Sequence, residues 1–393
     1  MSPANDHVVG DGGLTITSLD ASASRGVEGD RPRTVLLTGA TSLLGRLVAA
    51  NLIARGHRVV ALLRPTSPVT AESMWSTVEG ITAPPHEELT ILRGDVRELD
   101  LGLERDEVAR LAGVEVVVHL ARPRAGEQAS PNALVDGHKG VIGFARRLGS
   151  LERLVVLSST AVAGDYTGRF YEDWLDIGQS HPSAAERQLV QAERYAREAA
   201  TYLPVVVARH ALLVGHSLTG QIECRAGLSR LFSMVEKLAL LPSFVHPLGP
   251  AHGERYLTVS PVDYVARGIV ELCTSRTVLP GTCTCFADPE PPTLAEFWDT
   301  LLDRVGGPTA GVRIPVVDKG VTGWAVQSLA RNSAWLSGLV GRGEGPWVFL
   351  LQRGEHDVTN ARRLLGPVGV RCPKLATYLD ALYEDYQRRK RRS

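Results

Sequence analysis

The segment TVLLTGATSLLG at residues 34–45 constrains the fold of this chain most strongly. An apolar run, TVLLT, is followed by glycines at positions 39 and 45 and then by the amphipathic stretch LLGRLVAANLIARG. This order predicts a buried strand, a tight turn, and a helix whose N-terminus faces the turn. Backbone N–H groups at such a helix N-terminus bind phosphate, so the segment predicts a dinucleotide site.

Apolar stretches of strand length alternate with helical stretches beyond this turn. The expected strands are HRVVALL, LTILRGDV, VEVVVHLA, RLVVLSS and PVVVARHALLVG, and the expected helices cover residues 132–149 and 184–201. Short, continuous apolar runs suit strands that are buried on both faces of a parallel sheet. We therefore expect an α/β protein with a doubly wound (Rossmann) parallel sheet and a smaller C-terminal substrate lobe.

Three segments follow from this pattern. Residues 1–31 lack an apolar h-region and are expected to form a disordered leader. Residues 32–215 are expected to form the NAD(P)-binding Rossmann domain. Residues 216–390 are richer in turns and include a helix opened by a Thr293–Glu296 capping box. We expect this last segment to form an interleaved substrate-binding lobe over the carboxyl ends of the strands.

Charge and cysteine content exclude several function classes. Lys plus Arg and Asp plus Glu both number 43, so no global charge favours nucleic acid or an anionic membrane as a partner. No apolar run reaches about 18 residues, so we expect a cytoplasmic protein that does not span a membrane. The five cysteines are irregularly spaced, which argues against a disulfide framework. Cys283 and Cys285 are expected to be core thiols, and no metal site is predicted.

Residues around the glycine turn indicate which dinucleotide is bound. Gly39 permits the tight turn and Gly45 permits close packing of helix on strand, whereas Ser42 stands where a third glycine is expected and either bonds a phosphate or crowds it. Arg64 ends the second strand and either faces solvent or accommodates a 2′-phosphate; the second interpretation favours NADP(H) over NAD(H). Asp95 either touches the adenine or caps a turn. The expected cofactor-binding residues are Gly39, Thr41, Ser42, Leu43, Leu44, Gly45, Arg64, Asp95, Val96 and Ala121.

With these residues in place, the chain resembles the extended short-chain dehydrogenase/reductases (SDRs), and within them the fatty acyl-CoA and carrier-protein thioester reductases. The matching stretches include TGATSLLG, VVVHLA, VDGHKGVIGFARRL, LVVLSSTAVAGDYTGRFYED, SPVDYVARGIVEL and DVTNARRLLGPVGVRCP. The resemblance covers roughly residues 34–385. It implies a small-molecule or acyl-thioester substrate, and a homodimer is a possible assembly.

Most of the residues with which that family transfers protons are replaced. The resemblance puts the family's serine or threonine on Ser159, its tyrosine on Ala185 and its lysine on Leu189. The asparagine that orders the relay water falls on Leu134, and the proline after the arginine of the sixth strand falls on His210. Alanine and leucine can neither donate a proton nor lower the pKa of a phenol, so ordinary carbonyl reduction is disfavoured.

The alignment on the helix has a physical basis. Ser183 and Glu186 predict a capping box, which puts Ala185 in the first helical turn and Leu189 one turn later on the same face. Ser159 and His210 are then the candidate catalytic residues. The serine hydroxyl either polarises a substrate carbonyl or bonds the adjacent backbone. The histidine either faces the nicotinamide as an acid or base or is packed and satisfied in the core.

Three functions remain open. We favour a diverged enzyme that binds NADP(H) and acts on an acyl or polyketide-like intermediate by cyclisation, isomerisation, dehydration or a lyase reaction. The second is an NADP-dependent oxidoreductase whose proton comes from His210, another side chain or water. The third is a pseudoenzyme, a binding protein that keeps the fold and a vestigial nucleotide site.

Overall fold

The computed structural model describes residues 31–75, 88–123, 132–181, 183–222, 256–305 and 354–392, with short pieces between residues 228 and 249 and at 313–315. Apart from Arg31, the expected leader at 1–31 lies outside the described residues. The guanidinium of Arg31 pairs with Glu115 and Glu152 and so joins the beginning of the described chain to the sheet.

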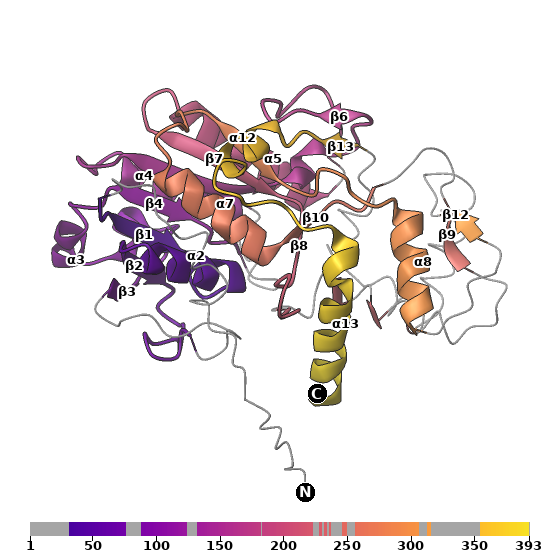
Figure 1. The fold of residues 1–393 in the computed structure, drawn as a ribbon. Coiled ribbons are helices and arrows are strands. Elements are labelled where there is room, and N and C mark those ends of the chain that lie inside the picture. The colour runs from indigo at the N-terminus through magenta and orange to yellow at the C-terminus, as the bar shows by residue number, and fades with distance from the viewer. Residues whose placement is uncertain are drawn as a thin grey trace, which may run out of the picture.

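A seven-stranded sheet in the order β11-β7-β5-β4-β1-β2-β3 forms the centre of the fold (Figure 1). Every neighbouring pair is parallel. The strands are β1 (Thr34–Thr38), β2 (Arg58–Leu63), β3 (Leu89–Arg93), β4 (Val116–His119), β5 (Arg153–Ser159), β7 (Val205–His210) and β11 (Cys283–Phe286). The chain runs outward from β1 to β3, then returns to β4 and continues in the opposite direction. This confirms the doubly wound Rossmann sheet, with its switch point between β1 and β4.

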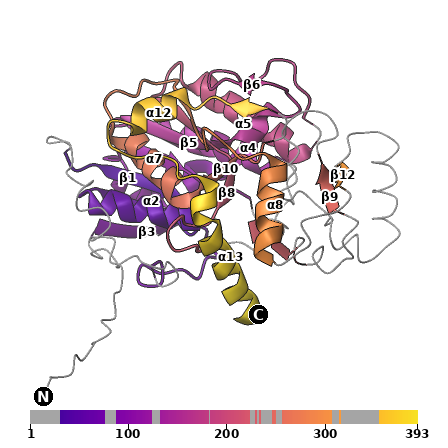
Figure 2. The same cartoon turned by 45° about the vertical axis from the view of Figure 1, so that its right-hand side comes forward.

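Helices cover both faces of this sheet (Figures 1 and 2). One face carries α2 (Leu43–Ala54), α7 (Val262–Thr274) and α12 (Thr359–Leu365), and the other carries α4 (Ala133–Ala145) and α5 (Ala184–Ala199). The short elements η2 (Leu99–Gly102) and α3 (Arg105–Arg110) lie between β3 and β4, and η3 (Thr160–Ala163) follows β5. The described architecture is therefore three layers, helices–sheet–helices, as repeated β-α units require.

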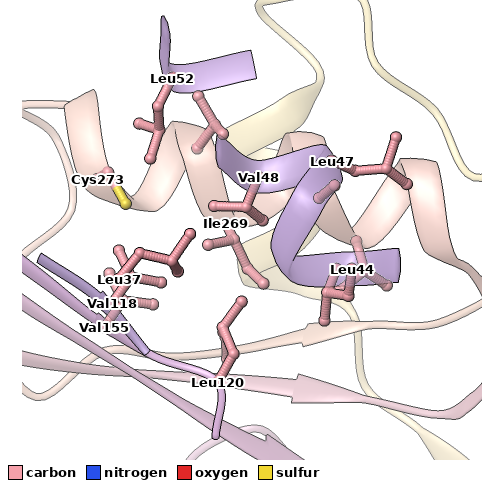
Figure 3. Close-up of a cluster of buried hydrophobic side chains, with 14 of the residues drawn as sticks. Leu37, Leu44, Leu47, Val48, Leu52, Val118, Leu120, Val155, Ile269 and Cys273 are labelled. Carbon is pink, nitrogen blue, oxygen red and sulfur yellow. The ribbon is translucent and has the colours of Figure 1, made fainter. Parts of the chain in front are cut away.

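Strand residues alternate between two buried clusters. Leu37 and Val118 face α2 and α7, where Figure 3 shows them below Val48 and Ile269. Their neighbours in sequence contribute instead to the cluster beneath α4 and α5. Because successive side chains on a strand point to opposite faces, a strand covered on both sides must be apolar throughout. That requirement explains the unbroken apolar runs TVLLT and VVVH.

A second unit is built around its own apolar cluster. Its elements are β8 (Leu212–Val214), β10 (Val259–Pro261), α8 (Leu294–Val305) and α13 (Leu375–Arg392). Phe297 of α8 and Leu379 of α13 are both buried in this cluster, and the two helices lie near each other in Figure 2. The expected capping box forms at the start of α8, where the hydroxyl of Thr293 accepts from the Glu296 N–H.

The two units are interleaved along the chain. β11, α7 and α12 all follow residue 215, yet they pack with the Rossmann layers. Three two-stranded parallel sheets lie outside the main sheet: β8 with β10, β9 (His246–Gly249) with β12 (Arg313–Pro315), and β6 (Arg169–Phe170) with β13 (Glu355–His356).

The prediction that PVVVARHALLVG forms a single strand is wrong. The run divides at Ala211: β7 ends at His210 in the main sheet, and β8 begins at Leu212 in another sheet. The Ala211 N–H donates to the hydroxyl of Ser260 over 2.8 Å, which supplies the partner that a neighbouring strand would otherwise provide. The side-chain hydrogen bond therefore lets the chain leave one sheet and enter the next within one residue.

Candidate functional site

A cavity of about 710 Å³ lies at the carboxyl ends of the central strands. Residues after β1, β2, β3 and β4 form one end of its lining, while His210 of β7 and Leu213, Ile222 and Leu228 from the second unit form the other. All of the expected cofactor-binding residues except Gly45 line it. The cavity thus spans the switch point of the sheet and reaches the second unit, as ligand sites do in doubly wound folds.

The glycine turn is held by close backbone packing. Gly39 has φ +75°, and a Cβ added there would lie 2.6 Å from the backbone carbon of Leu120. A Cβ on Gly45 would lie 2.3 Å from the carbonyl oxygen of Gly39. Ser42 is the N-cap of α2: its hydroxyl donates to the Gly39 carbonyl over 2.9 Å and accepts from the Gly45 N–H over 3.0 Å. The serine therefore stabilises the turn from within it.

Arginines surround the end of the cavity formed by β2 and β3. The terminal Nη2 of Arg64 donates to the backbone carbonyl of Arg122 over 3.0 Å, which joins the loops after β2 and β4. Asp95 accepts from the backbone N–H and the Nε of Arg97, both over 2.9 Å. The hydrogen bonds from Arg97 hold the pKa of Asp95 below its usual value. Asp95 therefore caps a turn and also lines the cavity.

Arg122 is a charged cavity residue that sequence reasoning missed, as it missed Arg46 and Arg97. It follows the HLA segment after β4, and its Nε and Nη2 atoms are buried without a hydrogen-bond partner among the described residues. Burial lowers the pKa of its guanidinium to about 10, which leaves the group charged at neutral pH. The only signal in the sequence is an arginine directly after an apolar strand end, and no glycine or spacing motif marks it.

His210 lines the cavity, and its ring is neutral. Its Nδ1 lies 2.5 Å from the carbonyl oxygen of Ala211, so Nδ1 carries the proton and the buried Nε2 is an acceptor. Burial, with a smaller contribution from the charge of Arg122, lowers the pKa of His210 to about 3. An imidazole in this state accepts hydrogen bonds and holds no proton on Nε2 to donate.

Ser159 is buried at the end of β5 and caps η3. Its hydroxyl accepts from the Ala161 N–H over 3.2 Å, and Ser159 is not among the residues that line the cavity. It pairs in register with His210 on the neighbouring strand β7. The geometry thus brings the two candidate catalytic residues side by side, with only the histidine facing the cavity.

Helix α5 does not itself line the cavity in the described structure, and the packing that joins it to the lining residue Leu134 is apolar. The Ser183–Glu186 capping box is present, so Ala185 lies in the first turn of α5 as expected. The half-buried Leu189 packs against two apolar clusters, one containing Leu134 and the other Val162 of η3. Leu134 itself lines the cavity.

Metal-ligating residues are not grouped in the described parts of the chain. No set of three or more histidine, cysteine, aspartate or glutamate side chains there has an arrangement that could hold a metal ion. Cys273, Cys283, Cys285 and Cys372 are free thiols, and burial raises the pKa of each of them. None of the described helices has the length and apolar character that crossing a membrane requires.

The profile of the family described as Male sterility protein matches residues 37–269 of the 393. This chain belongs to the Male sterility protein family. The match begins in β1 and ends in α7. It therefore includes the loops after β1, β2, β3 and β4, whose residues line the cavity. Its profile is that of an NAD-binding domain, and family membership agrees with the expected NAD(P)-binding fold.

Relatives of this family member occur within much longer proteins. A carboxylic acid reductase of Mycobacterium tuberculosis is 26% identical over 349 residues, which are 77% of this chain and 28% of that protein. The hybrid PKS-NRPS synthetase pvhA of Talaromyces variabilis is 29% identical over 252 residues, 61% of this chain and 6% of that protein. The chain thus spans less than a third of the length of either relative.

Solved structures share the fold over nearly the whole chain. The terminal R domain from the myxalamid PKS-NRPS biosynthetic pathway has a TM-score of 0.71 at 23% identity, covering 93% of this chain and 92% of that chain. A thiolation-reductase di-domain from an archaeal non-ribosomal peptide synthetase has a TM-score of 0.68 at 17% identity, covering 92% and 76%. Together with the family match, these similarities confirm the extended SDR fold and its thioester reductase-like branch.

Proposed function

We propose that this chain binds NADP(H) in the cavity and reduces an acyl thioester to an aldehyde without a tyrosine–lysine pair. One observation carries the proposal: the cavity has a glycine turn and several arginines among its lining residues, and the lining residue that packs with α5 is Leu134. Relatives named as carboxylic acid reductases and reductase domains support a redox reaction over the non-redox reactions that the sequence alone favours.

The charges that line the cavity suit a phosphorylated dinucleotide. Arg46, Arg64, Arg97 and Arg122 line it, and Asp95 is the only carboxylate among its described lining residues. Arg46 lies in the first turn of α2, whose N-terminus attracts phosphate. Arg64 follows β2, where an arginine accommodates a 2′-phosphate, which favours NADP(H) over NAD(H). When bound, the reduced cofactor supplies a hydride to the substrate.

A site without a tyrosine–lysine pair favours thioesters over ketones as substrates. Hydride addition to a ketone or aldehyde leaves an alkoxide that must be protonated before the product can leave, so a general acid matters. Hydride addition to a thioester leaves an oxyanion that collapses by expelling a thiolate, and no proton is needed at that step. A site without a phenol–ammonium pair can therefore still reduce a thioester if it stabilises the oxyanion.

A non-redox reaction on the same class of intermediate is the second candidate. The apolar packing of Leu134 and Leu189 favours it, because a site free of water supports cyclisation or elimination by desolvation. In that reaction NADP(H) would be retained or absent, and its redox state would not change. The remaining alternative, a binding protein without catalysis, predicts cofactor binding and no conversion of any substrate.

Two measurements separate these functions. Purified protein is first titrated with NADPH, NADP⁺ and NADH by calorimetry, and we expect NADPH to bind more tightly than NADH. A panel of straight-chain acyl N-acetylcysteamine thioesters is then compared with the matching aldehydes and with ketones, by following NADPH absorbance and analysing the products. We expect NADPH to be consumed with thioesters only. Absence of binding at millimolar NADPH would eliminate the redox proposal, and product formation without cofactor turnover would establish the non-redox reaction.

A further inference from the structure

Arg122 holds a positive charge inside the cavity without a described partner for two of its nitrogens. Its backbone carbonyl accepts from Arg64. Its side-chain Nε and Nη2 atoms are buried and make no hydrogen bond to any described residue. Burying polar atoms without a hydrogen bond costs free energy, and burying a charge without a counter-ion costs more. A side chain in this state is expected to have a ligand as its partner.

None of the described groups near this guanidinium neutralises it. The electrostatic effect of Arg122 reaches the imidazoles of His119, His138 and His210, and burial together with that charge lowers the pKa of all three rings. His119 and His138 contact each other edge to face at 4.6 Å between ring centroids. Burial keeps all three rings neutral at pH 7, so Arg122 is the cation among these described groups.

The other arginines of the cavity have different positions. Arg46 lies on α2 at the glycine turn, and Arg64 follows β2. Arg97 is committed to Asp95 by an ion pair. Arg122 differs from them because its charge acts on His210, which ends the strand beside Ser159. It is therefore the arginine of this set that interacts with the end of the cavity nearest β5 and β7.

We propose that Arg122 is a catalytic residue: its guanidinium holds the negative charge that develops on the carbonyl oxygen of the thioester, in place of a phenol–ammonium pair. This inference rests on the proposed thioester reduction. An anionic oxygen is the chemistry that two unpartnered, charged N–H donors recognise. The same chemistry occurs in the phosphates of the cofactor, and the experiments below distinguish the two sources.

The step balances without an acid on the protein. The reduced nicotinamide would supply the hydride that forms the new C–H bond, and the π electrons of the carbonyl would move to its oxygen, whose negative charge Arg122 would hold. The oxyanion then re-forms the C=O bond as the C–S bond breaks, and the sulfur leaves with the electron pair as a thiolate. The thiolate takes a proton from solvent. The thioester carbon is reduced to an aldehyde, and the cofactor is oxidised.

The test compares Arg122→Leu with Arg122→Lys, which keeps the charge, and with Arg110→Leu, an exposed arginine on α3. We expect Arg122→Leu to lower the thioester reduction rate by about 10²–10³-fold, the usual effect of removing an oxyanion donor. Arg122→Lys should lose less, and Arg110→Leu should match the wild type. The Kd for NADPH should change by less than about 3-fold in all three variants. Loss of one charged hydrogen bond to the cofactor would raise the Kd by more than that.

Two readouts do not depend on turnover. Calorimetry in the presence of NADP⁺ measures binding of the free carboxylate of the same acyl chain, whose oxygens resemble the oxyanion. We expect this affinity to fall at least about 10-fold in Arg122→Leu, as loss of a charged hydrogen bond implies. The Tm of Arg122→Leu should equal or exceed that of the wild type, because the variant removes a buried charge without a protein partner.

Each result decides between specific claims. A large loss of NADPH affinity in Arg122→Leu would make Arg122 a cofactor-phosphate ligand and overturn the inference. Unchanged thioester reduction, or a clear fall in Tm, would overturn it as well, the latter by showing a structural role. If the wild type binds NADPH but reduces no thioester, the proposed function itself fails and the inference fails with it. If the wild type reduces thioesters, an unexpected result in the Arg122 variants contradicts only the role of Arg122 and leaves the proposed function standing.

Discussion

Glu193 of α5 and Arg209 of β7 form a fully buried ion pair. The Nε of Arg209 donates to Oε2 of Glu193 over 3.0 Å, and Nη2 donates to Oε1 over 2.6 Å. Ser158 of β5 donates its hydroxyl to the same carboxylate over 2.6 Å. The pair thus joins a helix to two strands, one residue before both Ser159 and His210. Although burial acts in the opposite direction, Arg209 holds the pKa of Glu193 below its usual value.

Breaking this pair should destabilise the protein strongly. Glu193→Gln leaves the Arg209 guanidinium buried without a counter-ion, which costs about 3–5 kcal/mol. The matched control is Asp176→Asn, because the Asp176–Arg194 pair is about half exposed and such pairs contribute about 1 kcal/mol or less. Urea unfolding followed by circular dichroism measures both. Equal changes in the free energy of unfolding of the two variants would show that the buried pair contributes no more to stability than the exposed pair.

The glycine turn predicts a difference between two glycine-to-alanine variants. A Cβ at Gly45 would lie 2.3 Å from a backbone oxygen, so Gly45→Ala must displace the turn and weaken NADPH binding. A Cβ at Gly143, on the exposed side of α4, meets no atom within 4 Å, and alanine there should stabilise the helix by up to about 1 kcal/mol. Calorimetric titration with NADPH checks the first variant, and thermal unfolding checks the second. Wild-type NADPH affinity in Gly45→Ala would contradict the proposed position of the pyrophosphate.

Arg64 should determine the choice between cofactors. A charged hydrogen bond to a 2′-phosphate contributes about 1.5–3 kcal/mol, so Arg64→Leu should weaken NADPH binding by roughly 10–100-fold. NADH lacks that phosphate, so its affinity should stay the same and serves as the internal control. Both affinities come from one set of titrations. A parallel loss of both would show that Arg64 acts on the cavity as a whole.

Glu172 gives the stability a dependence on pH. Burial raises its pKa to about 7 from a value of 4.5, although the N–H groups of Cys285 and Asn360 donate to its carboxylate. The folded protein then binds this proton more tightly than the unfolded chain does, so the free energy of unfolding falls as pH rises from about 4.5 to about 7, by about 3 kcal/mol. Glu172→Gln should flatten that decline in urea-unfolding series. A wild-type stability that rises over the same window, with no change in the variant, would contradict this.

The repeated β-α units could be predicted because their signal is local. Apolar runs, the glycine turn and two capping boxes each lie within a few residues, and all of them correspond to described elements. The division of one apolar run at Ala211 could not be predicted in this way. The hydroxyl that permits it belongs to Ser260, distant in sequence.

The site itself was only partly predictable. Gly39 and Arg64 follow from position within a β-α unit, so sequence reasoning finds them. No sequence motif marks Arg122. Whether its Nε and Nη2 find a hydrogen-bond partner depends on which elements surround the cavity. The protonation state of His210 could not be predicted from the sequence either. Its ring is neutral because of burial and because of the charge of Arg122, 88 positions earlier in the chain.

Introducing a proton donor on α5 should change the product. Ala185→Tyr/Leu189→Lys puts a phenol and an ammonium one turn apart on α5, at the two positions to which the family resemblance assigns a tyrosine and a lysine. We expect this double variant to reduce aldehydes to alcohols with NADPH, whereas the wild type should not. Each single variant is the control, because either group alone lacks the partner that tunes the phenol.

The most direct test is therefore to identify the product that the wild-type protein forms from an acyl N-acetylcysteamine thioester and excess NADPH. Gas chromatography with mass detection separates the aldehyde from the alcohol, and NADPH absorbance gives the number of hydrides transferred. A site that works without a tyrosine–lysine pair predicts the aldehyde, with one NADPH oxidised for each thioester cleaved. Alcohol as the main product, with twice that consumption, would show that the wild type protonates an alkoxide efficiently and would contradict the account.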